Sequence, residues 1–149
     1  MDIYSLPISK FMTKNVITAE ITSTVKSVCK SMYDKNVGSV VIVKPTTEGT
    51  VPVGMITERD VVKIVGSLEL FSPEVPIRPF MSSPLVTGSS AMTITKAIEI
   101  MSKKNIRRLP ITDKDSIREE TARYRYGKRY HKLNCKTKQK LIAEEMKLP

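Results

Sequence analysis

The chain has 149 residues, and 25 Lys and Arg against 15 Asp and Glu give it a formal net charge of +10. Its 40% hydrophobic residues can form the core of one compact domain or of two small repeats. No apolar run approaches the roughly 18 residues of a membrane span, and Met1-Asp2 does not begin a secretory signal, so we expect a cytoplasmic protein without transmembrane helices.

An internal repeat organises most of the chain. Residues 8–42 align without a gap with residues 77–111, which lie at a constant offset of 69. Such a register indicates two copies of one structural unit. We therefore divide the chain into a first repeat (8–66), a linker (67–76), the recognisable part of a second repeat (77–115) and a basic C-terminal segment (116–149).

The first half of each repeat predicts a short strand followed by an amphipathic helix. We expect the strands at residues 16–18 and 85–87. In both helices apolar residues recur at i, i+3, i+4 and i+7, the spacing of one buried face. These residues are Val25, Val28, Cys29 and Met32, and then Ile94, Ala97, Ile98 and Met101. Ser23 or Thr24 and Thr93 suit the N-caps, and the asparagine after each helix suits a left-handed C-terminal position.

The second half of the first repeat predicts a hairpin and a second helix. We expect strands at residues 40–43 and 51–56, a turn at residues 45–49, and a helix that opens at residues 57–60. The apolar residues expected on the buried side of this helix are Val61, Val62, Ile64 and Val65.

The second repeat is expected to be incomplete. A strand is predicted at residues 109–112, but Arg118-Glu119-Glu120 stands where an apolar strand should follow. Because neither copy can bury its sheet face alone, we predict an α/β (α+β) fold of tandem β-α-β-β-α repeats that pack through their sheets.

Catalytic and metal chemistry find no support in the residue pattern. The single histidine, His131, lies in the basic segment, and no glycine-rich phosphate loop occurs. Cys29, Cys135 and His131 are too few and too widely spaced for a zinc site. We therefore predict a binding module rather than an enzyme, with no metal and no cofactor.

Thr57 and Asp60 place a hydroxyl and a carboxylate three residues apart, where a strand enters a helix. The pair suits the two hydroxyls of a ribose, near the positive end of the helix dipole. Gly54 would let a ligand approach the backbone closely. The same spacing is also close to a helix capping box, which needs no ligand, so both interpretations stay open.

Arg107 and Arg108 begin the predicted strand of the second repeat. Arginine suits phosphate through its forked guanidinium, although a charged doublet is also common on solvated surfaces. Since neighbouring strand residues point to opposite faces, we expect at most one of the two to face a site.

In these segments the sequence resembles the cystathionine-β-synthase (CBS) domain pair. The matching segments are Phe11-Met12, Phe80-Met81, residues 36–41, residues 105–110 and Gly54 to Asp60. The resemblance implies two clefts between the repeats for adenosine-containing ligands such as AMP, ADP, ATP or S-adenosylmethionine. It also implies a homodimer that regulates an unidentified protein.

The resemblance also assigns residues to the two clefts. One would hold the ribose with Thr57 and Asp60, the phosphate with Arg107 or Arg108, and the base with Leu85, Val86, Thr87 and Pro110. The other would use Val16, Ile17, Thr18, Gly38, Ser39 and Val40, with Thr121 at the position of Thr57. Because Tyr124 stands in place of the second carboxylate, we expect at most one functional nucleotide site.

Residues 116–149 carry +6 of the net charge, and their simplest interpretation is a solvated, partly disordered end of the chain. Two alternatives stay open: interleaved arginines, lysines and tyrosines could contact nucleic acid, or the segment could reflect a shifted reading frame in the gene. For the repeats themselves, a role in dimerisation alone also stays open. The function that the residues favour is a non-enzymatic regulatory module that binds an adenine nucleotide.

Overall fold

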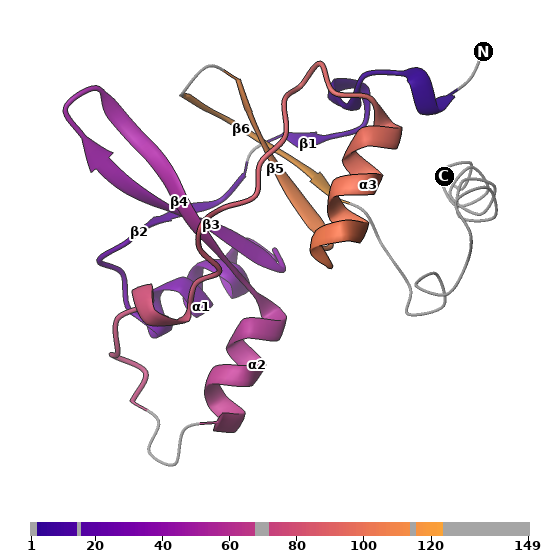
Figure 1. The fold of residues 1–149 in the computed structure, drawn as a ribbon. Coiled ribbons are helices and arrows are strands. Elements are labelled where there is room, and N and C mark those ends of the chain that lie inside the picture. The colour runs from indigo at the N-terminus through magenta and orange to yellow at the C-terminus, as the bar shows by residue number, and fades with distance from the viewer. Residues whose placement is uncertain (1–2, 15, 68–71, 114–115, 124–149) are drawn as a thin grey trace.

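The structure is a computed structural model that describes residues 3–14, 16–67, 72–113 and 116–123 (Figure 1). Its helices are α1 (Val25–Asp34), α2 (Glu58–Ser67) and α3 (Ile94–Lys104), with 3-10 turns η1 (Ile3–Ser5), η2 (Ile8–Lys10) and η3 (Arg78–Phe80). Its strands are β1 (Thr13–Lys14), β2 (Thr18–Glu20), β3 (Ser39–Thr46), β4 (Gly49–Thr57), β5 (Arg108–Asp113) and β6 (Ser116–Arg123). No helix in these ranges is long and apolar enough to span a membrane.

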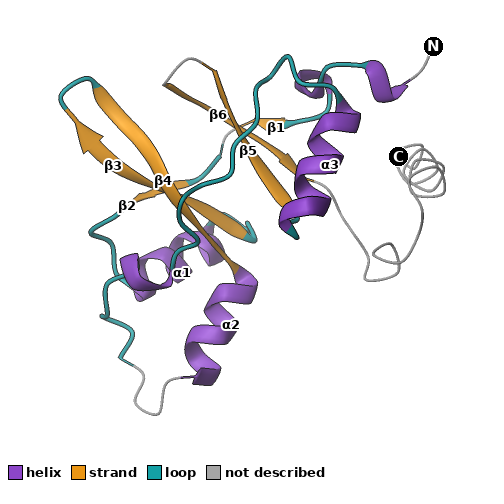
Figure 2. Ribbon diagram, in the orientation of Figure 1, coloured by secondary structure: helices purple, strands orange, loops and turns teal. Residues whose placement is uncertain are grey.

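Two three-stranded sheets form the framework of the molecule (Figure 2). The first has the order β2-β3-β4, with β2 parallel to β3, and the second has the antiparallel order β1-β6-β5. Helices α1 and α2 contact the first sheet, and α3 contacts the second. The mixed α+β fold and the tandem repeats predicted from the sequence are therefore confirmed.

The segment at the start of each repeat closes the core of the other repeat. Ile77 is fully buried against Val25 and Val28 of α1, whereas Ile8 is buried in the core of α3. The backbone repeats this exchange, because Val25 N–H donates to the Val75 carbonyl at 2.9 Å and Ile94 N–H donates to the Leu6 carbonyl at 3.1 Å. Figure 1 accordingly shows the indigo N-terminal segment beside α3.

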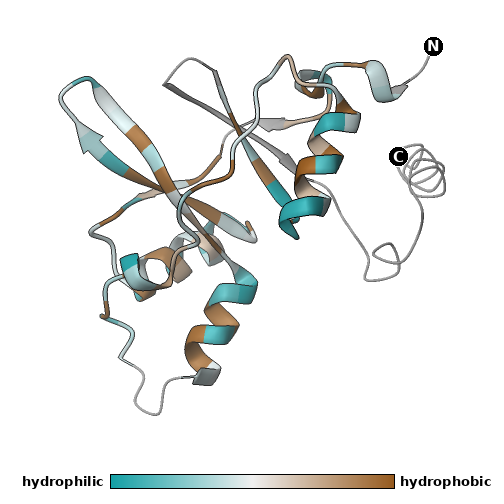
Figure 3. Ribbon diagram, in the orientation of Figure 1, coloured by the Kyte–Doolittle hydropathy of each residue, from teal (hydrophilic) through white to brown (hydrophobic). Residues whose placement is uncertain are grey.

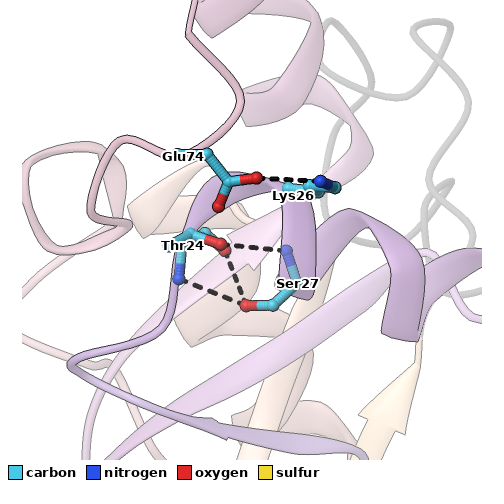
Figure 4. Close-up of polar contacts among 4 residues, drawn as sticks. All are labelled: Thr24, Lys26, Ser27 and Glu74. Carbon is cyan, nitrogen blue, oxygen red and sulfur yellow. Dashed lines mark hydrogen bonds and ion pairs between the residues drawn. The ribbon is translucent and has the colours of Figure 1, made fainter.

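Local capping signals fix the ends of α1 and α3 as expected. Thr24 caps α1 in a reciprocal capping box with Ser27, drawn in Figure 4. Thr93 caps α3 by accepting from the Lys96 N–H at 3.3 Å. Both asparagines take the left-handed conformation, with φ of 51° at Asn36 and 52° at Asn105.

The absence of a strand after residue 115 was a wrong expectation. Strand β6 forms there and lies between β5 and β1. Thr121 is opposite Pro110 on one side and opposite Thr13 on the other. Backbone pairing on two sides can hold a strand whose residues have low strand propensity, because that propensity depends on context. The helix that would follow falls on residues 124–149, outside the described ranges.

Two further expectations need correction. The first predicted strand begins at Thr18 and runs to Glu20, and residues 85–87 form no strand. In place of that second strand, Gly88 makes an isolated parallel β-bridge with Ile111 of β5. On α2 only Ile64 is buried and Val61 is partly buried, because a single stripe of this helix faces the sheet. The apolar residues Val62 and Val65 are exposed instead, at 71% and 54%.

Candidate functional site

Thr57 and Asp60 form a reciprocal cap at the start of α2. The Thr57 N–H and hydroxyl both donate to Asp60 Oδ2 at 2.8 Å, and the Asp60 N–H faces Thr57 Oγ1 at 3.4 Å. Within the described part of the chain, no group donates to the other carboxylate oxygen, Oδ1. The cap uses Oδ2 of Asp60 and leaves Oδ1 available to an external donor.

Arg108 of the second repeat lies beside the first residue of α2. Its Nη2 lies 4.0 Å from Oε2 of Glu58, the first residue of α2, and only 14% of its side chain is exposed. Arg107 is exposed, so one arginine of the doublet lies at the start of α2 and the other does not. A largely buried cation, the Glu58 carboxylate and the N-terminus of α2 thus meet at one junction between the repeats.

Gly38 provides the space in which the Arg108 guanidinium lies. A Cβ at Gly38 would come within 2.9 Å of the Glu58 carboxylate and would overlap the Arg108 guanidinium. The Gly38 carbonyl also accepts from the Glu58 N–H at 3.1 Å, which ties strand β3 to the start of α2. The sequence assigned Gly38 to the other cleft, but the structure places it beside Arg108.

Gly54 has a role other than the one expected. It is buried, and a Cβ there would lie 2.7 Å from Met81 Sδ and 2.9 Å from the Ser82 carbonyl oxygen. The neighbouring Met55 pairs with Ser82 through backbone hydrogen bonds in both directions. The absence of a side chain at Gly54 therefore makes room for Met81 and Ser82 of the second repeat, not for a ligand.

The residues expected around the base are divided between two clusters. Leu85 packs against Val41, Val43 and Met55 of the first sheet, whereas Val86 packs against the core of α3. The remaining two are Thr87, which is exposed, and Pro110, which is buried and accepts from the Gly88 N–H at 2.9 Å. The structure thus does not gather all four into one wall.

The residues assigned to the second cleft are also dispersed. Val16 packs in the same cluster as Leu85, although the two were assigned to different clefts. Val40 is fully buried in the core of α1, so its side chain cannot line a cleft. Ile17 packs against that core, Thr18 is exposed and Ser39 is partly exposed.

The alignment of Thr121 with Thr57 is wrong. Strand pairing places Thr57 opposite Ser39, and the equivalent partner of Arg108 is Arg123. Thr121 instead lies opposite Pro110. The sequence alignment matched Thr121 and Arg123 to Thr57 and Arg59 by residue type, but the strand register places Arg123 at the position of Thr57. The end of β6 therefore carries an arginine where β4 carries the capping threonine.

Cys29 is a free, partly buried cysteine on α1. Burial raises the pKa of its thiol, which favours the uncharged and unreactive form. Cys135 lies outside the described residues. No group of three or more His, Cys, Asp and Glu side chains comes together in the ranges that the structure describes.

The CBS domain model matches residues 8–67 and 77–118, which together make up more than half of the chain. The chain belongs to the CBS domain family. An uncharacterized protein of Methanopyrus kandleri is 38% identical over 109 residues, which cover 73% of this chain and 54% of that protein. The CBS domain-containing protein YhcV of Bacillus subtilis is 31% identical over 106 residues, 71% of this chain and 72% of YhcV. This CBS pair therefore spans about half the length of the Methanopyrus relative.

Solved structures share the CBS pair fold at low sequence identity. A conserved protein of Pyrococcus horikoshii has a TM-score of 0.72 at 21% identity, covering 100% of this chain and 98% of that one. The CBS domain protein PAE2072 of Pyrobaculum aerophilum, complexed with AMP, has a TM-score of 0.66 at 22% identity, covering 77% and 82%. The CBS domain pair of protein MJ0100, in complex with 5′-methylthioadenosine and S-adenosyl-L-methionine, has a TM-score of 0.67 at 21% identity, covering 78% and 92%.

Sequence reasoning missed Glu58 as a member of the CBS pair junction. The residue follows Thr57 in the first turn of α2, where an acidic side chain stabilises the helix dipole without any ligand. Its contact with Arg108 joins positions 50 residues apart, and no local pattern encodes that contact. The sequence signal that could have identified Glu58 is its position between Thr57 and Asp60, two residues already assigned to the site.

Proposed function

We propose that this CBS pair is a non-enzymatic regulatory module that binds an adenosine-containing ligand where Arg108 meets the start of α2. The observation that carries the proposal is the 14% exposed Arg108 side chain, held by the second repeat against the capped helix of the first. A ligand bound there would contact both repeats at once. Its occupancy could then alter how the repeats are presented to another protein.

The chemistry of the junction suits a nucleotide. Asp60 retains Oδ1 for a ribose hydroxyl while Oδ2 keeps its bonds to Thr57, so capping and ligand binding are compatible. Arg108 offers the forked donor that phosphate prefers. Structures of similar fold with AMP, or with S-adenosyl-L-methionine and 5′-methylthioadenosine, support this class of ligand.

Titration calorimetry with AMP, ATP and S-adenosylmethionine tests the proposal. Asp60→Asn keeps an oxygen that can accept from Thr57 but removes the charge, so we expect the ligand that binds to lose about tenfold to hundredfold in affinity. Asp34→Asn, at an exposed position at the end of α1, is the matched control and should bind as the wild type does. Binding of none of the three ligands by the wild type would refute the proposal.

We further propose that the module is a cytoplasmic homodimer that uses the outer face of α2. Val62 and Val65 lie one turn apart on α2 and expose apolar side chains. Figure 3 shows hydrophobic and hydrophilic stretches alternating along this helix. Covering these side chains in a dimer would remove apolar surface from water. Analytical ultracentrifugation should show a dimer that Val62→Asp converts to monomer, and an unchanged dimer in that variant would contradict this interface.

A further inference from the structure

We infer that Glu58 is a built-in competitor for phosphate at Arg108, and that it sets how strongly the site prefers a phosphorylated ligand over an uncharged one. The inference rests on the proposed function, because it concerns the selectivity of the same site. It assigns a role to two residues, Glu58 and Gly38, that the binding proposal does not use.

The contact between Arg108 and Glu58 is unequal in exposure. The Arg108 side chain is 14% exposed and belongs to strand β5, whereas the Glu58 side chain is 71% exposed at the start of α2. A cation with so little access to water needs anionic or polar partners, but an exposed carboxylate can move into solvent at little cost. Glu58 is therefore the replaceable member of the pair.

A ligand phosphate would need the position beside the guanidinium that the Glu58 carboxylate approaches at 4.0 Å. Phosphate forms bidentate bonds to arginine, so it can displace the carboxylate, but the displaced charge then stays near an anionic ligand. An uncharged ligand such as adenosine meets no such competition and leaves the pair intact. Glu58 therefore weakens binding of AMP and not of adenosine.

Gly38 controls the same selectivity from the other side. The atoms that a Cβ at Gly38 would meet are the ends of the Arg108 and Glu58 side chains, which can move. Gly38 is not among the residues with positive φ, so alanine is compatible with its backbone. Gly38→Ala should therefore fold and displace the guanidinium from its present position without changing any charge.

Calorimetric titration of the full chain with AMP and with adenosine tests the inference. For Glu58→Gln we expect AMP to bind about threefold to tenfold more tightly and adenosine to change by less than about twofold. For Gly38→Ala we expect AMP to bind about tenfold more weakly, again with adenosine unchanged. Glu48→Gln, at the exposed turn between β3 and β4, removes the same charge far from Arg108 and should alter neither ligand.

The outcomes separate this inference from the proposed function. If the wild type binds both ligands but Glu58→Gln shifts both equally or neither, the competition is refuted while the binding site stands. An equal gain for AMP in Glu48→Gln would also refute it, since net charge would then explain the effect. If the wild type binds neither ligand, the proposed function fails and the inference with it. Urea unfolding of each variant verifies that the measured protein is folded.

Discussion

The two repeats of this CBS pair use equivalent residues for the same packing contacts. Ile77 and Ile8 lie at the constant offset of 69 and enter the cores of α1 and α3. Each also donates its N–H to the carbonyl that precedes the helix cap, at 2.9 Å to Ser23 and at 2.7 Å to Met92. Each repeat thus depends on the other for one core residue and for part of its backbone hydrogen bonding.

The repeats differ where side chains leave the core. Strand β3 begins with Ser39, which lies opposite Thr57 of β4. Strand β5 begins with Arg108, which lies opposite Arg123 of β6. The junction at the start of α2 therefore combines an arginine from one repeat with a threonine and a carboxylate from the other. Packing holds both repeats to one backbone plan, while positions at the strand ends diverge without disturbing it.

The largest effect is expected from breaking the exchanged cores. Ile77→Ala and Ile8→Ala should each destabilise the fold by about 2–5 kcal/mol, because each leaves a cavity among buried aliphatic side chains. Urea unfolding measures the loss. The 86% exposed Tyr33 provides the control, and Tyr33→Ala should change stability by less than about 0.5 kcal/mol. A change that small in Ile8→Ala would show that the repeats are not mutually dependent.

A smaller loss of stability is expected at Gly54, where the first repeat has no room for a side chain. Gly54→Ala should cost about 1–3 kcal/mol, because its Cβ would meet the Ser82 carbonyl of the backbone, which cannot move alone. Gly54 lies opposite Ile42 in the first sheet. The equivalent residue of the second repeat, Ile111, lies opposite Glu120, so only the first repeat requires a glycine at this position. Gly38→Ala is the internal control, since its neighbours are flexible side-chain ends, and should cost less in the same urea experiment. Equal losses in the two variants would contradict this reasoning.

Removal of the helix caps should lower stability by a smaller amount, and by different amounts in the two repeats. Thr24→Ala and Thr93→Ala each remove an N-cap, which is worth about 0.5–2 kcal/mol. We expect Thr24→Ala to be the more costly, because Thr24 shares a reciprocal box with Ser27 whereas Thr93 accepts a single bond. Thermal unfolding of the two variants gives the order, and a reversed order would contradict the role of the box.

Local signals explain what the sequence could predict. The helical period of α1 and α3, their threonine caps and the left-handed asparagines each depend on residues within one or two turns, and all were placed correctly. Thr57 and Asp60 are three residues apart, so their contact was foreseeable as well.

Long-range contacts explain what the sequence could not predict. Strand β6 is set by its pairing with β1 and β5, and β1 is about 100 residues earlier in the chain. Gly38 acquires its role only when β5 brings Arg108 across from the second repeat. Exposure on α2 also depends on which stripe meets β4, which the apolar pattern of Val61 to Val65 leaves undetermined.

The smallest expected effect concerns an ion pair that only the first repeat has. Lys26 Nζ lies 2.8 Å from Glu74 Oε1 beside the α1 cap (Figure 4). The equivalent position on α3 holds Thr95, whose hydroxyl donates to the Tyr4 carbonyl at 3.1 Å. The hydrogen bond and the charge of Glu74 raise the pKa of Lys26 above its ordinary 10.5. The second repeat thus makes the same bridge between leading segment and helix without a charge.

A raised pKa means that the pair stabilises the folded state fully below pH 10.5 and loses this contribution as pH rises through the folded pKa of Lys26. Because both side chains are largely exposed, salt should screen the effect. Glu74→Gln should return the Lys26 pKa toward 10.5 in an NMR titration, and Glu48→Gln should leave it unchanged. The pH dependence of stability above pH 10 should weaken with it. An unaltered Lys26 pKa in Glu74→Gln would show that this ion pair does not join residue 74 to α1 in solution.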